Sequence, residues 1–259
     1  DISTIDFSLT NGGEIKLSGS FFFDSLGDVT GGTIFSIVVN RSVNGALDYS
    51  YTGLTMSFED FVNFPTTAAF LTSALGGADR LIGGGGSDTL VGLGGNDTIS
   101  GGGGNNSLDG GSGVNMVDYS GANTPIEVDL SAHFVGNNGN GGQDTLANFQ
   151  IVRGPDGFTN TYISSTAGGE TFLGGGGDDS YIIKGPSVAV VEGFRSGTDQ
   201  EISEVPSLTL ADNIETLWLR GAAAVNGTGN AMDNLIIGNS NNDQLLGLDG
   251  NDTLQAGGG

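Results

Sequence analysis

The chain of 259 residues carries 30 acidic and 7 basic side chains, a formal net charge of −23. That charge makes nucleic acids and anionic membranes poor partners and cations good ones. No apolar run is long enough for a membrane-spanning helix, so we expect no membrane insertion. With no cysteine and one histidine, His133, the chain lacks disulfide bonds and the usual zinc ligands. Its 49 glycines and scarce helix formers favour an all-β protein.

The first 73 residues have an ordinary composition. Their apolar residues alternate or cluster as strands do, and Gly- and Asn-rich turns separate the runs. We expect a small antiparallel β domain here. It should be followed by a short helix within 57–75, capped by Ser57 and interrupted at Pro65.

A nine-residue repeat then begins, written Gly-Gly-x-Gly-x-Asp-x-aliphatic-x, and five successive units fit from Ala74 to Asp118. The acid positions of these units hold Asp79, Asp88, Asp97, Asn106 and Asn115. The aliphatic positions hold Leu81, Leu90, Ile99, Leu108 and Val117. A flexible linker has no reason to keep acids and aliphatic residues in phase, so the pattern predicts an ordered repeat structure.

The repeat returns in two later blocks, separated by segments that keep strand-like runs without the spacing. The acid positions of these two blocks hold Glu170, Asp179, Asn234, Asp243 and Asp252. The predicted order is a small β domain at 1–73, repeat block one at 74–118, spacer strands at 119–153, repeat block two at 154–183, spacer strands at 184–225 and repeat block three at 226–259.

Each unit is best understood as a six-residue turn followed by a three-residue strand, so two units make a coil of 18 residues. Asp79 should then lie over Asp97, and Asp88 over Asn106. Two carboxylates about 5 Å apart repel by roughly 1 kcal/mol in water and about 3 kcal/mol at an effective dielectric of 20. Several calcium ions between the turns would reverse that repulsion, because calcium accepts carboxylate and carbonyl oxygens in flexible geometry, whereas magnesium demands a tight octahedron. The spacing predicts a right-handed parallel β-roll, or β-solenoid, with calcium in its turns.

The units "GGGGSDTLV", "GLGGNDTIS" and "GGGGDDSYI" also resemble the RTX (repeat-in-toxin, haemolysin-type) calcium-binding family. The resemblance implies calcium at each turn and type I secretion. It further implies an ion held by the carbonyls at positions two and four and the acid of one unit, facing the carbonyls at positions one and three and the acid two units on.

Carried over by position, this ligand set pairs Leu75, Gly77 and Asp79 with Gly92, Gly94 and Asp97, and Gly84, Gly86 and Asp88 with Gly101, Gly103 and Asn106. The resemblance extends a metal-binding role to Gly95, Asn115, Glu170, Gly175, Gly177, Asp179, Asn234, Asp243, Gly247, Asp249 and Asp252. At Asn106, Asn115 and Asn234 the family's acid is replaced by a neutral amide, which still offers an oxygen but less charge.

Nothing in the sequence points to catalysis. His133 has no second histidine or cysteine to work with, and neither a zinc-binding helix motif nor a serine elbow occurs. Trp218 is expected in the core rather than in a sugar-binding platform. The sequence therefore favours a non-enzymatic, calcium-folded segment of a larger extracellular or bacterial cell-surface protein.

Two alternatives stay open. The first is a self-assembling surface-layer, matrix or fibre protein, for which self-association or binding to other surface proteins is expected. The second is the C-terminal module of a secreted hydrolase or toxin whose catalytic domain lies outside this chain.

Overall fold

The computed structural model describes residues 4–8, 14–23, 29–40 and 49–57 as backbone strands, and in full 76–194, 197–221, 223 and 225–258. The regular elements in these ranges are all β-strands, which confirms the all-β prediction for them. The predicted helix after Ser57 and the predicted boundary at residue 73 lie outside the described residues. Across the part of the chain that was described, no helix is long and apolar enough to cross a membrane.

The chain divides into two compact units. One comprises residues 1–117 and 144–149, and the other comprises residues 118–143 and 150–259. The boundaries predicted between repeat blocks and spacers stay predictions.

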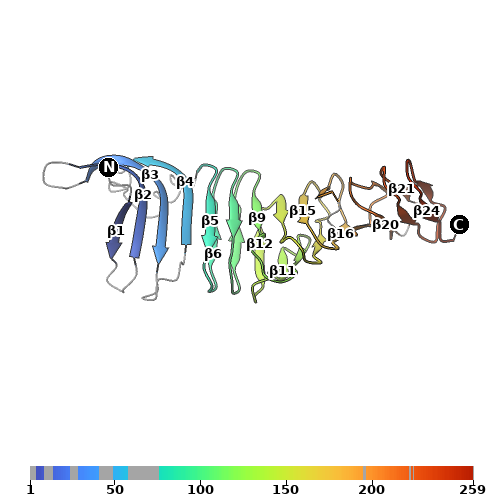
Figure 1. Cartoon of the computed structure of the whole chain (residues 1–259), viewed down its shortest axis with the longest axis horizontal. Coiled ribbons are helices and arrows are strands. Elements are labelled where there is room, and N and C mark those ends of the chain that lie inside the picture. The colour runs from blue at the N-terminus through green and yellow to red at the C-terminus, as the bar shows by residue number, and fades with distance from the viewer. Residues whose placement is uncertain are drawn as a thin grey trace. The chain divides into compact units, whose positions relative to one another are not determined.

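The first unit opens with an antiparallel sheet. Its strands are β1 (Thr4–Ser8), β2 (Glu14–Phe23), β3 (Val29–Asn40) and β4 (Tyr49–Ser57). Successive strands pair antiparallel, as the sequence predicted. The same sheet continues into the repeats, because β4 pairs antiparallel with β5 (Arg80–Gly83) (Figure 1).

From β5 onward the first unit is a parallel coil with two sheets. One sheet continues through β7 (Thr98–Ser100) and β9 (Met116–Asp118), and the other contains β6 (Thr89–Val91), β8 (Ser107–Asp109) and β12 (Asp144–Ala147). Leu81 lies opposite Ile99, and Leu90 lies opposite Leu108. Units two apart therefore stack, and the predicted 18-residue coil is confirmed.

The core of this coil is a double row of aliphatic side chains. The aliphatic residue of each repeat in this coil is fully buried between neighbours that are less buried, as period-two strands require. These residues are Leu81, Leu90, Ile99, Leu108 and Val117. Each such burial stabilises the fold by about 1.5–3 kcal/mol, so a strand of only three residues can still contribute to the core.

The second unit continues the parallel pattern with less regular spacing. It begins with the antiparallel hairpin of β10 (Glu127–Asp129) and β11 (Phe134–Asn137). From β10 its longest sheet runs through β14 (Thr161–Ile163), β16 (Ser180–Ile183), β18 (Gln200–Ser203), β20 (Thr216–Leu219), β22 (Leu235–Ile237) and β24 (Thr253–Gln255). A second sheet holds β13 (Ile151–Arg153), β15 (Thr171–Gly175) and β17 (Ala189–Glu192), and a third holds β19 (Ser207–Thr209), β21 (Asn226–Thr228) and β23 (Gln244–Leu246).

An aromatic cluster fills part of the interior of the second unit. Tyr162 stacks on Tyr181 with ring centroids 5.0 Å apart, and Phe172 lies 5.4 Å from Tyr162. All three side chains are fully buried. By contrast, Trp218 is 37% exposed, with the Arg220 guanidinium 5.8 Å from its ring centre. The prediction that Trp218 packs in the core was wrong, because strand alternation turns its two neighbours in β20 inward instead.

Candidate metal centres

The side chains at the acid positions form columns along the coil. The backbone N–H of Asp79 donates to Oδ1 of Asp97 at 2.9 Å, and that of Asp97 donates to Oδ1 of Asn115 at 2.9 Å. On the other side of the coil, the N–H of Asp88 donates to Oδ1 of Asn106 at 2.9 Å. One oxygen of each such side chain therefore joins a turn to the turn 18 residues earlier.

The second oxygen of two of these carboxylates has no such partner. Oδ2 of Asp79 and Oδ2 of Asp97 are buried and accept no hydrogen bond from any residue described here. Burial, together with repulsion from Asp97, raises the pKa of Asp79 to about 6, and burial raises the pKa of Asp97. A buried carboxylate oxygen without a partner is costly, so these two atoms fit a cation ligand.

Glycine at the first turn position leaves room beside these oxygens. A Cβ built on Gly92 would collide with Oδ2 of Asp97 and lie 2.7 Å from the carbonyl oxygen of Gly110. A Cβ on Gly83 would likewise lie 2.7 Å from Oδ2 of Asp88 and collide with the carbonyl of Gly101. Carboxylate and carbonyl oxygens of successive coils thus face one space. This donor set, with neither sulfur nor imidazole, fits calcium.

The amides at acid positions behave differently from the carboxylates. The Asn106 amide nitrogen donates to Oδ1 of Asp144 at 2.9 Å, and that of Asn115 donates to the carbonyl of Asn148 at 3.1 Å. The Asn234 amide nitrogen donates to the carbonyl of Ile214 at 3.2 Å. An amide donor satisfies the oxygens that would otherwise face a cation, so these three positions can be held without an ion.

The other predicted ligands lie in turns or at strand ends, as their positions in the repeat require. The glycines Gly77, Gly84, Gly86, Gly94, Gly95, Gly101, Gly103, Gly177 and Gly247 lie between strands, and Gly175 ends β15. Leu75 lies outside the described residues, and Asp249 is exposed in a turn. Gly95 has φ +113°, and a Cβ there would collide with the carbonyl of Gly77, so this turn requires glycine.

The acids of the two later blocks are also ordered by backbone N–H groups. Oδ1 of Asp179 accepts from Asn160 at 2.7 Å, and Oε1 of Glu170 accepts from Ser165 at 3.1 Å. The second oxygens of both are buried without a hydrogen bond from the described parts of the chain. In block three, Oδ1 of Asp252 accepts from Asn234 at 2.9 Å.

Asp243 in block three is satisfied on both sides. Its Oδ1 accepts from Val225 at 3.1 Å and its Oδ2 accepts from Asn239 at 2.6 Å. Among these later acids, therefore, Asp179 and Glu170 resemble Asp79 and Asp97 most closely.

Sequence reasoning missed several members of the columns. Asp144 accepts from the N–H of Asn106 at 3.0 Å across 38 residues of sequence, and its "DTL" triplet repeats that of Asp88. Asp199 accepts from the N–H of Asp179 at 2.7 Å, and Glu215 accepts from the N–H of Asp199 at 2.8 Å. The triplet would have identified Asp144. At Asp199 the signal is hidden, because Glu201 stands in the aliphatic position.

His133 lies in an exposed turn with φ +56°, as expected of a loop residue.

Comparison with known proteins gives one family. The model of the RTX calcium-binding nonapeptide repeat matches residues 73–98, 82–117 and 228–259, with four copies. Neither the curated proteins nor the solved structures contain a match. Block two, around Asp179, lies outside the matched residues. The family implies calcium as the bound ion, which agrees with the oxygen-only donor set described above. The chain thus carries RTX calcium-binding nonapeptide repeats at residues 73–98, 82–117 and 228–259.

Proposed function

We propose that this chain is a calcium-folded segment of a larger secreted or cell-surface protein, with a structural role, a part in secretion and no reaction of its own. The observation that carries the proposal is the pair of buried, unpartnered carboxylate oxygens on Asp79 and Asp97, one coil apart. Without a cation these columns repel and oppose closure of the coil. With calcium the same oxygens become ligands, so binding and folding are coupled.

The proposed ligands in block one are two carboxylates with the carbonyl groups of the turns around them. Asp79 and Asp97 would hold one ion, and Asp88 would take part in a second with less charge, because Asn106 stands opposite it. Block two would bind through Glu170 and Asp179, whose second oxygens are free of hydrogen bonds within the described structure.

The secretion role follows from the same coupling. RTX repeats occur in secreted bacterial proteins, and calcium is scarce inside cells and plentiful outside them. A chain that folds only with calcium would stay extended until export and then close its coil outside. Type I secretion and an extracellular location are therefore part of the proposal.

Chelation followed by calcium addition tests the function directly. Far-UV circular dichroism in excess EGTA should show loss of β structure in the repeats, and calcium should restore it. Magnesium at the same concentration is the control and should restore little, because open carbonyl turns fit its tight octahedron poorly. An unchanged β spectrum after complete removal of calcium would contradict the proposal.

Two alternative functions would use the same calcium binding. In a surface-layer, matrix or fibre protein the solenoid would bind neighbouring copies, and particle size would increase when calcium is added. In a hydrolase or toxin, the catalytic domain would be encoded beside this segment in the full-length gene. Light scattering with and without calcium tests the first alternative, and the full-length sequence tests the second.

A further inference from the structure

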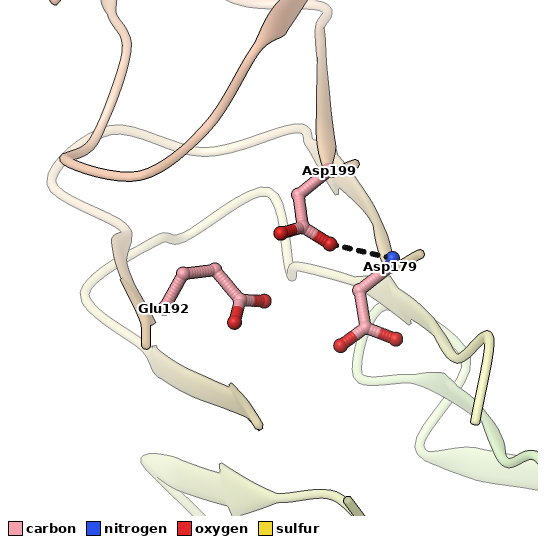
Figure 2. A group of neighbouring side chains, drawn as sticks. All are labelled: Asp179, Glu192 and Asp199. Carbon is pink, nitrogen blue, oxygen red and sulfur yellow. Dashed lines mark hydrogen bonds between the residues drawn. The ribbon is translucent and has the colours of Figure 1, made fainter. Parts of the chain in front are cut away.

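A cluster of three acids lies inside the second unit, outside the segments that match the repeat family. Asp179, Glu192 and Asp199 each bring a carboxylate oxygen to within 4.8 Å of the other two. Figure 2 shows the three carboxylates turned toward a common space, with Glu192 reaching it from the opposite side to the two aspartates. The side chains are 1%, 7% and 1% exposed, respectively.

Glu192 stands where the preceding coil has a glycine. Val191 of β17 pairs with Leu173 of β15, and Glu192, the last residue of β17, pairs with Gly175 across a register shift at Gly174. A Cβ on Gly174 would lie 2.6 Å from Oδ2 of Asp179 and would collide with Glu192 Oε1. In the nonapeptide repeats, glycine leaves space here beside carbonyl oxygens. In this coil Glu192 places a third carboxylate in that space, which the nonapeptide repeat does not supply.

Two oxygens of the cluster point into it without a partner. Oδ1 of Asp179 and Oδ1 of Asp199 accept backbone N–H groups at 2.7 Å each, from Asn160 and Asp179. Their Oδ2 atoms are buried and accept no hydrogen bond within the described ranges. Glu192 is held in place by the hydroxyl of Tyr181, which donates to its Oε1.

The surroundings favour a cation over a neutral ligand. Burial raises the pKa of Asp179 to about 8 and that of Asp199 to about 7, with Glu192 adding repulsion at both. A group of buried carboxylates must bind either protons or a cation to be stable. A cavity of about 460 Å³ lined by Arg153, Asp156, Gly175, Val191 and Glu192 offers an ion a route to the cluster.

We infer that Asp179, Glu192 and Asp199 form a divalent-cation site that binds calcium more tightly than the two-carboxylate sites of the nonapeptide repeats. The choice of calcium rests on the proposed function, whereas the site itself rests on the convergence of these three carboxylates and their unpartnered oxygens. Three carboxylates supply more charge than two, and charge count is one of the main determinants of calcium affinity.

The test uses the whole chain and terbium, a luminescent calcium analogue that emits when a nearby aromatic ring transfers energy to it. Tyr181 donates to Glu192 and stacks on Tyr162, so a bound ion would lie beside two tyrosines. Terbium emission excited through tyrosine should appear at the lowest ion concentrations. Added calcium should displace the terbium and so lower the emission.

The decisive variant is Glu192→Gln, and the matched control is Glu201→Gln, which alters another buried acid of the same unit that lies outside the cluster. Glu192→Gln should weaken the tightest site roughly tenfold or more, because it removes one of three charged ligands. Native mass spectrometry at limiting calcium should count one ion fewer than in the parent protein. Glu201→Gln should change neither readout. If Glu192→Gln does not fold, Glu192→Gly, which restores the glycine of the preceding coil, should show the same loss.

The outcomes separate this site from the proposed function. Equal ion counts and equal terbium affinities for the parent and Glu192→Gln would overturn the site and leave calcium folding of the repeats untouched. A second outcome is that Glu192→Gln abolishes the tyrosine-excited emission while EGTA leaves the β structure of the parent protein unchanged. This result would support the site and reject the proposed function. A parent protein that binds no divalent cation near neutral pH would overturn the site in favour of protons shared among the carboxylates.

Discussion

At the residue scale, the two carboxylate oxygens of Asp97 have different roles. Oδ1 accepts a hydrogen bond from the turn one coil earlier, and Oδ2 is buried without a hydrogen bond from the described residues and is the atom that we propose binds an ion. Asparagine can fill the first role but not the second, since its other atom is a donor, as at Asn115. This division explains how both amides and acids can occupy the columns without disturbing the coil.

Replacement of Asp97 separates the two roles. Asp97→Asn should keep the hydrogen bond from Asp79 and raise the calcium midpoint of folding, because it removes one carboxylate. Asp97→Ala should raise the midpoint further and also cost about 1–3 kcal/mol, because it leaves a buried N–H unsatisfied. Calcium titrations followed by circular dichroism would measure both effects. Equal midpoints for the parent protein and Asp97→Asn would mean that Asp97 is not a ligand.

The glycine beside each acid can be tested by adding one methyl group. Gly92→Ala would place Cβ against Oδ2 of Asp97 and the carbonyl of Gly110, so we expect it to abolish the ion site and raise the calcium midpoint by about tenfold or more. Gly85→Ala is the control, because a Cβ there meets nothing within 4 Å. Isothermal titration calorimetry with calcium should show one site lost in the first variant only. A similar loss in both would indicate a general effect of glycine replacement on the turns.

At the element scale, a short strand contributes to the core by burying its middle side chain, as β6 and β7 do with Leu90 and Ile99. In the four-residue strand β18, one of the buried positions holds Glu201, opposite Tyr181 of β16 and Leu217 of β20. Its carboxylate accepts the N–H of Ala211 at 3.2 Å. Burial raises the pKa of Glu201 from 4.5 to about 7, so this strand carries an acid that prefers to be neutral.

Glu201 therefore makes stability depend on pH in a defined direction. The folded state holds its proton more tightly than the unfolded state, so stability is lost as pH rises from about 4.5 to about 7. Glu201→Gln keeps the acceptor for Ala211 and does not titrate. It should match the parent protein at pH 4.5 and exceed it at pH 8 by up to about 3 kcal/mol. Urea denaturation in saturating calcium at both pH values measures this difference. A larger advantage at the lower pH would refute the assignment.

At the scale of the whole molecule, the parallel coil extends beyond the segments in which the nonapeptide spacing is regular. In the second unit, Tyr162 lies opposite Tyr181 and Ile182 opposite Ile202, so one coil takes 19 residues and the next takes 20. The family model matches only where the coil is built from two nine-residue units. Turns of variable length are tolerated because the strands, rather than the turns, carry the parallel ladder and the buried row.

The sequence by itself determined the coil of the first unit. The stacking of Leu81 on Ile99 and of Asp79 beside Asp97 follows from a period of nine, because each unit repeats the same local turn and strand. The choice of an oxygen-binding cation also follows from residue types alone, with acids and glycine at fixed places and no cysteine. Local geometry repeated without change needs no knowledge of distant contacts.

Only the tertiary structure decided which residues outside the regular repeats join the columns. Asp144 takes its place beside Asn106 after an excursion of 38 residues, and nothing in a local pattern gives the length of such an excursion. Glu192 meets Asp179 and Asp199 because the end of β17 in one sheet and the starts of β16 and β18 in another lie beside one interior space. Convergence of that kind depends on how coils stack, and a glutamate at a strand end looks, in sequence, like any other surface acid.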